Sequence, residues 1–247
     1  MMIGTIKQSA LILIALVLPE FAATPLFAKE PPFWKGNIEL SYVQTSGNTD
    51  SLSLLTAGKV QRRLTRSKFT AEAKGIYGKK GDVTSDKSWN AMLKYDHSLT
   101  DRLSLFALES VERNTLKGIE FRFIHQGGIG YYFMNTPTDT LEGQAGAGYT
   151  QEDLIDPFDN RELPTSRLFI GYVHTFTETN LFEQTIEYLL NLKDEQDYII
   201  NEESALTTNL MGNFALKISF ALTYDNVPTE NFQKMDRLFK TALLYTF

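Results

Sequence analysis

Histidine is the first residue to examine for catalysis, because a neutral imidazole can take a proton from a nearby hydroxyl group. The chain has three histidines: His97, His125 and His174. A phospholipase-like site on a strand would need a serine two residues after a histidine, on the same face. The positions two residues further on hold Leu99, Gly127 and Phe176. We therefore predict no catalytic residues and no enzymatic activity, with each histidine at a strand end or in a polar interior.

Carboxylates are the second group that could do chemistry, because they are the ligands that Ca²⁺ prefers. They gather in the segment 151–162, where the candidate ligands of a divalent cation are Asp153, Asp156, Asp159 and Glu162. Their spacing does not match an EF-hand loop. A solvated charged loop explains the same composition, there and at Glu202 and Glu203. We predict no metal site and no cofactor, and these four carboxylates remain the candidates if a divalent cation binds.

The elements that would carry these residues are β-strands. One face of the segment 214–224 is apolar throughout: Phe214, Leu216, Ile218, Phe220, Leu222 and Tyr224. Such alternation with turn residues between the segments is typical of antiparallel strands. It recurs about twelve times, roughly at 34–46, 51–63, 67–79, 86–98, 102–113, 119–133, 140–152, 165–177, 181–193, 203–212, 214–225 and 235–247. Near 103–113 and 167–176 the alternation is less regular, and which side faces outward stays open there.

The number of strands and the lengths of the connections indicate a closed membrane barrel. An even number brings both ends of the barrel domain to the same side of the membrane. Connections after even-numbered strands are short, as at 64–66 and 99–101, whereas most of those after odd-numbered strands are longer, at 80–85, 114–118, 153–164, 194–202 and 226–234. Short periplasmic turns and long outer loops give this asymmetry. The predicted fold is all-β, a transmembrane antiparallel up-and-down β-barrel of about twelve strands.

The register of these strands predicts the lining of the lumen. A charge on the lipid face near the midplane costs about 2–4 kcal/mol, so charged residues within strands should point inward. The predicted lining residues are Glu72, Lys74, Asn90, Lys94, Glu142, Gln144, Glu183, Glu187, Lys217 and Lys240. Both signs of charge are present. Either a narrow polar channel or a lumen closed by ion pairs fits this set.

The last strand carries an apolar face that runs to the end of the sequence. Phe239, Leu243, Tyr245 and Phe247 share one side of it. We predict that these residues form the assembly signal for the machinery that inserts barrels, and that this strand pairs with the one that begins near Trp34.

The first 28 residues are typical of a secretory signal peptide. Lys7 precedes an apolar run from Ala10 to Leu18, and small residues follow. That run is shorter than the roughly 20 residues that a membrane-spanning helix needs. We predict cleavage after Ala28, or else after Ala23. Residues 29–247 then form a single barrel domain of an exported protein.

Charge and composition exclude nucleic acid as a partner. The chain has 24 Lys and Arg against 30 Asp and Glu, without the basic excess that nucleic-acid binding needs. There is no cysteine, so the domain folds without disulfides.

One motif near the start of the barrel resembles a known family. The segment from Trp34 to Tyr42 begins W-K-G and is followed by T-S-G-N-T-D-S at 45–51. This pattern is similar to the salt-induced outer-membrane proteins, a bacterial domain family of unknown function. The resemblance implies an outer-membrane location, but neither a substrate nor catalytic residues. The residues Gly47 and Asn48 themselves indicate a tight turn.

The function expected from the sequence is that of a monomeric outer-membrane barrel, either a narrow porin-like channel or an envelope protein of osmotic stress. Its expected partners are membrane lipid, lipopolysaccharide and the barrel-assembly machinery. Two alternatives stay open. The first is a non-conducting structural or adhesion barrel whose outer loops bind ligands or cations, and the second is a soluble periplasmic β-sandwich or lipocalin-like binding protein.

Overall fold

The computed structural model describes residues 33–45, 51–80, 83–230 and 232–247. The predicted signal peptide and the predicted turn at Gly47 and Asn48 lie outside these residues. Twelve strands and one short 3-10 helix follow in order: β1 Phe33–Thr45, β2 Ser51–Arg63, β3 Ser67–Lys80, β4 Val83–Ser98, β5 Leu103–Asn114, η1 Thr115–Lys117, β6 Ile119–Asn135, β7 Asp139–Leu154, β8 Arg161–Thr175, β9 Asn180–Asn191, β10 Tyr198–Met211, β11 Phe214–Asp225 and β12 Met235–Thr246. No helix among the described residues has the length and apolar character to span a membrane.

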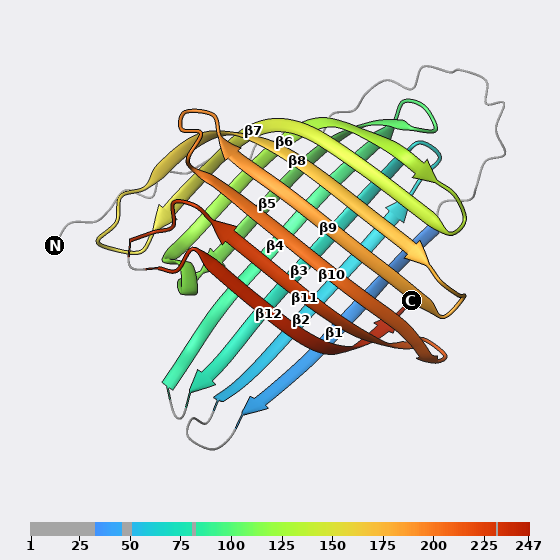
Figure 1. Ribbon diagram of the computed structural model, residues 1–247, viewed down its shortest axis with the longest axis horizontal. Coiled ribbons are helices and arrows are strands. Elements are labelled where there is room, and N and C mark those ends of the chain that lie inside the picture. Colours follow the sequence, from blue (N-terminus) through green and yellow to red (C-terminus); the bar gives the residue numbers. More distant parts are fainter. Residues whose placement is uncertain (1–32, 46–50, 81–82, 231) are drawn as a thin grey trace. The chain divides into compact units, whose positions relative to one another are not determined.

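The strands form one closed antiparallel barrel in which each strand pairs with its neighbours in sequence and β1 pairs with β12 (Figure 1). The predicted fold class and number of strands are therefore confirmed. The closing seam pairs Asn37–Leu40 with Thr246–Leu243. Beyond it, Gly36 and Phe247 exchange two backbone hydrogen bonds, at 2.8 and 3.0 Å. No sheet edge is left unpaired in the described barrel, as a lipid environment requires.

The two ends of the barrel differ in their connections. We call one end the turn end; its connections are 64–66, 99–102, 136–138, 176–179 and 212–213. The other is the loop end, with connections 115–118, 155–160, 192–197 and 226–234. The predicted long connection at 80–85 was wrong, because β3 continues to Lys80 and β4 begins at Val83. β10 begins five residues earlier than predicted, where Tyr198 packs between the rings of Tyr188 and Tyr224.

The distribution of polar and apolar side chains is the reverse of that in a soluble protein. Large apolar side chains cover the outside; Ile38, Leu93 and Phe239, for example, are exposed. Most of the buried residues are polar, among them Gln126 and Gln144. Such an exterior would be unfavourable in water but suits lipid. The soluble β-sandwich alternative is therefore wrong, because the strands form one closed barrel rather than two packed sheets.

Candidate functional site

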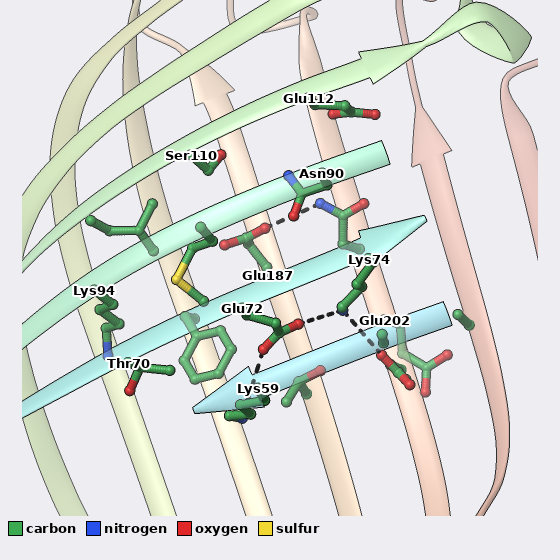
Figure 2. A pocket seen from close by; sticks show the side chains of 18 of the residues that line it. Lys59, Thr70, Glu72, Lys74, Asn90, Lys94, Ser110, Glu112, Glu187 and Glu202 are labelled. Carbon is green, nitrogen blue, oxygen red and sulfur yellow. Dashed lines mark hydrogen bonds and ion pairs between the residues drawn. The ribbon is translucent and has the colours of Figure 1, made fainter. Parts of the chain in front are cut away.

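The lumen contains a cavity of about 700 Å³ lined mainly by polar and charged side chains. It extends from Gln61 and Lys68 near the turn end to Asn114 and Lys117 at the loop end. All of the residues predicted to line the lumen are found on its wall: Glu72, Lys74, Asn90, Lys94, Glu142, Gln144, Glu183, Glu187, Lys217 and Lys240. Figure 2 shows how several of these side chains, from strands on different sides of the barrel, point toward one another.

Seven charged side chains form a connected network that we call the charge belt: Glu39, Lys59, Glu72, Lys74, Glu203, Lys217 and Lys240. On β1, Glu39 accepts a hydrogen bond from Lys217 Nζ at 2.8 Å and lies 3.4 Å from Lys240 Nζ. On β10, Glu203 lies 3.6 Å from Lys217 Nζ and 3.7 Å from Lys240 Nζ. The lysines of β11 and β12 thus connect the carboxylates of β1 and β10.

The charge belt also crosses the lumen. Lys74 on β3 lies 2.9 Å from Glu72, as Figure 2 shows, and 3.9 Å from Glu203 on β10. On the shorter way around the ring, four strands separate β3 from β10. The pair therefore connects nearly opposite walls, and the belt narrows the lumen at this level.

Within the belt, the cations are presented to the cavity unevenly. The side chains of Lys59 and Lys74 are 41% and 47% exposed, whereas Lys217 and Lys240 are largely covered. Exposed charges in water interact weakly and are screened by salt, whereas covered ones hold their partners more firmly. The β2 and β3 side of the belt is therefore its most accessible part.

The wall formed by β5 to β8 carries a second cluster of paired charges. Arg122 on β6 donates to Glu152 at 2.6 Å and to Glu112 at 3.4 Å, and Arg161 lies 2.6 Å from Glu152. All four side chains belong to β5, β6, β7 and β8. Movement of Arg122 away from these carboxylates would leave buried charges without a partner, which is strongly unfavourable. The pairs therefore hold its side chain in place.

Deeper in the same wall, an aromatic ring takes up part of the lumen. Phe106 is buried, with the Arg167 guanidinium 5.5 Å and the Lys94 ammonium 5.4 Å from its centroid. A Cβ at Gly146 would lie 2.8 Å from this ring, so the glycine makes room for it. Arg167 also donates to Glu187 at 2.6 Å. Arg167 itself lines the cavity, so this cluster forms part of the cavity wall.

Comparison with known proteins identifies the family. The sequence model of the family described as "Protein of unknown function, DUF481" matches residues 38–247. The chain belongs to this family. The family resemblance inferred from the opening motif is thereby confirmed, although a role in salt stress does not follow from it.

This DUF481 chain is also similar to one curated protein and to several solved barrels. The Escherichia coli K12 protein YdiY, described as uncharacterized, is 24% identical over 207 residues, which cover 84% of this chain and 79% of that protein. A KdgM porin is 11% identical with a TM-score of 0.49, and the match covers 86% of this chain and 99% of the porin. A NanC porin is 10% identical with a TM-score of 0.48, covering 85% and 97%. These likenesses to solved structures concern the fold alone.

The predicted candidates outside the lumen have different outcomes. Among the described residues, no three His, Cys, Asp or Glu side chains lie close enough to share a metal ion, so Asp153, Asp156, Asp159 and Glu162 do not form a ligand set. Glu162 instead accepts a hydrogen bond from Tyr149 at 2.8 Å. The candidate assembly signal, made of Phe239, Leu243, Tyr245 and Phe247, is exposed on the outside of β12 and at the end of the sequence.

The position predicted for His125 was wrong. It lies within β6 on the outer face, 48% exposed at the side chain, and pairs with Glu109 of β5, which is 60% exposed. The alternation explains this, because His125 has the same parity as Phe123 and Ile129, which are also exposed. His97 and His174 lie near the ends of β4 and β8, as predicted.

Several residues that line the lumen are missing from the predicted set. Glu39 lies between the outward Ile38 and Leu40, so strand parity alone could have assigned it to the lumen. Arg167 belongs to a segment with irregular alternation, and Glu203 was assigned to a charged loop that the structure shows to be part of β10. No signal in the sequence distinguished these two.

Proposed function

We propose that this protein forms a narrow channel for small polar solutes or ions in the bacterial outer membrane. The observation that supports it best is the polar cavity, which extends along the lumen of a closed barrel whose exterior is apolar. The cavity has a volume of about 700 Å³, and charged groups of both signs line it. A polar cavity of this size favours water, ions and small polar solutes as its contents.

The orientation and partners belong to the same proposal. Short connections face the periplasm in outer-membrane barrels, so the loop end would face outward. The outward Phe239, Leu243, Tyr245 and Phe247 would be read by the assembly machinery, and the apolar exterior would contact lipid and lipopolysaccharide. We further propose that the barrel works as a monomer, since a single chain closes the sheet.

Single-channel recording of the refolded protein in planar bilayers tests this function. We expect discrete current steps of one small size, as a narrow lumen within each barrel would give. A bilayer that takes up correctly folded barrel, shown by heat-modifiable gel mobility, yet never shows a current step would refute the channel. The gel measurement separates failure to insert from failure to conduct.

One observation favours a second candidate, a non-conducting envelope barrel. Lys74 and Glu203 join nearly opposite walls of the lumen, and a lumen closed by ion pairs would pass nothing. Function would then lie in the outer loops. Removal of residues 153–160 should in that case change cell-surface binding of ligands or divalent cations while the barrel still folds; unchanged binding would reject this candidate.

A further inference from the structure

The charges that line the cavity are distributed unevenly around the barrel. The strands β11, β12 and β1 to β4 form one side, which we call the basic wall. It carries six lysines and three carboxylates: Lys59, Lys68, Lys74, Lys94, Lys217, Lys240, Glu39, Glu72 and Asp96. Figure 2 shows Lys59, Lys74 and Lys94 on neighbouring strands of this wall.

The other side has the reverse composition. The strands β5 to β10, together with η1, form what we call the acidic wall. It carries three cations and six carboxylates: Lys117, Arg122, Arg167, Glu112, Glu142, Glu183, Glu187, Glu202 and Glu203. A wall with an excess of positive charge therefore faces a wall with an excess of negative charge.

Taken together, the two walls are balanced, because nine cations and nine carboxylates line the cavity. Net charge is what draws ions of one sign into a pore, so this lumen has little preference for anions or for cations. An ion that is attracted by one wall is repelled by the other. A solute that carries both charges can instead have a favourable interaction with both walls at once.

Near the turn end, each wall has charged groups that other side chains leave accessible. Lys59 Nζ lies 3.8 Å from Glu72, whereas Lys74 is closer to the same carboxylate, at 2.9 Å, and the Lys59 side chain is 41% exposed. On the acidic wall, Glu142 accepts a hydrogen bond from Gln144 at 2.6 Å. In the described part of the chain, no ion pair involves Glu142 or Glu183. These three charges are available to a solute.

The same three residues face one another across the lumen. Five strands separate β2 from β8 in either direction around the ring, and β7 and β9 lie on the two sides of β8. Lys59 is on β2, Glu142 on β7 and Glu183 on β9. Each carboxylate is the fourth residue of its strand from the turn end, and Lys59 is the fifth residue from that end of β2. All three also line the cavity.

We propose that this part of the lumen is a binding site for small zwitterionic solutes, compounds that carry one ammonium group and one carboxylate. Lys59 attracts the carboxylate of the solute, and Glu142 and Glu183 attract its ammonium group. The inference rests on the proposed channel function and assigns it a class of solute. Contacts between exposed charges in water are weak, so a bound solute can leave the site again, as passage requires.

Osmotic swelling of vesicles that contain the refolded protein tests this site. The two solutes are 4-aminobutyrate, a zwitterion, and 4-hydroxybutyramide, which is similar in size and has no charged group. Both have no net charge, so neither needs a counterion to enter. At low ionic strength we expect the vesicles to swell about three- to tenfold faster in 4-aminobutyrate. Equal rates in the two solutes would overturn the proposal while the channel stands.

Variants assign the preference to the two walls. Lys59→Gln removes the charge from the basic wall, and the Glu142→Gln, Glu183→Gln double variant removes both charges from the acidic wall. In each, the preference should fall to less than twofold, while the swelling rate in 4-hydroxybutyramide stays the same. Glu178→Gln is the matched control, because Glu178 lies in the turn before β9, and it should keep the preference. A full preference in both wall variants, or its loss in Glu178→Gln, would overturn the site.

Two further results separate the site from the channel. In a KCl gradient, the ratio of K⁺ to Cl⁻ permeability should stay within about threefold of one, because the walls balance each other. A ratio further from one would overturn the proposal but leave the channel. Vesicles with folded barrel, shown by heat-modifiable gel mobility, that swell no faster than empty vesicles in either solute would refute the channel function and the site with it.

Discussion

Deletion of Phe247 should open the seam between β1 and β12. This seam is the shortest of the strand pairings, since it joins only Asn37–Leu40 with Leu243–Thr246, whereas β1 and β2 pair along Phe33–Thr45. Phe247 extends the seam by two backbone hydrogen bonds with Gly36. Its ring also lies against Gly36, where a Cβ would be 2.7 Å from the ring edge. The W-K-G motif thus has a physical reason: the glycine leaves room for this ring.

The size of the effect follows from these contacts. Each hydrogen bond contributes about 0.5–1.5 kcal/mol to stability, so two contribute roughly 1–3 kcal/mol. Phe247 is 54% exposed, and burial of the covered half of its side chain adds about 1 kcal/mol to the stability. Deletion should therefore destabilise the barrel by about 2–4 kcal/mol, or roughly 30-fold to 1,000-fold in the folding equilibrium. Phe247→Ala keeps the backbone bonds and should lose only about 1 kcal/mol.

Lys240→Gln serves as the comparison for the deletion of Phe247. Lys240 lies 3.4 Å from Glu39 and 3.7 Å from Glu203, but Lys217 contacts the same two carboxylates. Its replacement should cost about 1 kcal/mol or less. Urea-dependent folding into lipid vesicles, followed by heat-modifiable gel mobility, measures all three variants. Equal amounts of folded barrel after deletion of Phe247 and after Lys240→Gln would refute the reasoning.

Three further predictions concern the wall of the barrel. In a double-mutant cycle of Lys74→Gln and Glu203→Gln, urea unfolding should show a coupling of about 0.5–1 kcal/mol at low salt, lost near 1 M where the Debye length is about 3 Å; a coupling that ignores salt would contradict the direct ion pair. Gly148→Ala should lower the free energy of unfolding by about 1–3 kcal/mol, since its Cβ would collide with the His125 carbonyl; an unchanged urea midpoint would argue against that close approach. Replacement of both Glu109 and His125 by leucine should raise the stability of the barrel in lipid vesicles by about 1–3 kcal/mol, because two polar groups leave the lipid face; a lower midpoint would show that the pair is stabilising.

Two matched controls support these measurements. Gly58→Ala is also a glycine replacement within a strand, but the nearest atom to its Cβ is 3.9 Å away, so stability should stay within about 0.5 kcal/mol. Lys59→Gln removes an exposed belt lysine whose ion-pair partner, Glu72, is on the neighbouring strand. It should therefore show no coupling with Glu203.

The fold was predictable because the alternation of apolar and polar residues in a strand is visible within each short segment of the sequence. In β11 each apolar residue from Phe214 to Tyr224 is followed by a small or polar one, and that alone assigns Lys217 to the lumen. The charge belt was not predictable in the same way. The contact of Lys74 with Glu203 depends on the shear of the whole barrel, which brings particular rows of β3 and β10 to the same depth. No pattern within either strand contains that information.

His125 is an exception to the rule that polar residues within strands point into the lumen. That rule follows from the unfavourable free energy of a charge in lipid. The parity of His125 with Phe123 pointed outward, and that was the better signal. The rule fails because Glu109 lies directly across from His125 in the β5–β6 register, so each is the polar partner of the other.

The charge belt constrains how a solute could pass through the proposed channel. Lys74 and Glu203 narrow the lumen through an ion pair between nearly opposite walls. This barrier weakens as salt screens the ion pair, because the Debye length falls to about 3 Å at 1 M. Any response of the current to salt beyond that of the solution itself should therefore be smaller in the Lys74→Gln, Glu203→Gln variant than in the unchanged protein. An equal response in the two proteins would place the salt-sensitive step elsewhere in the lumen.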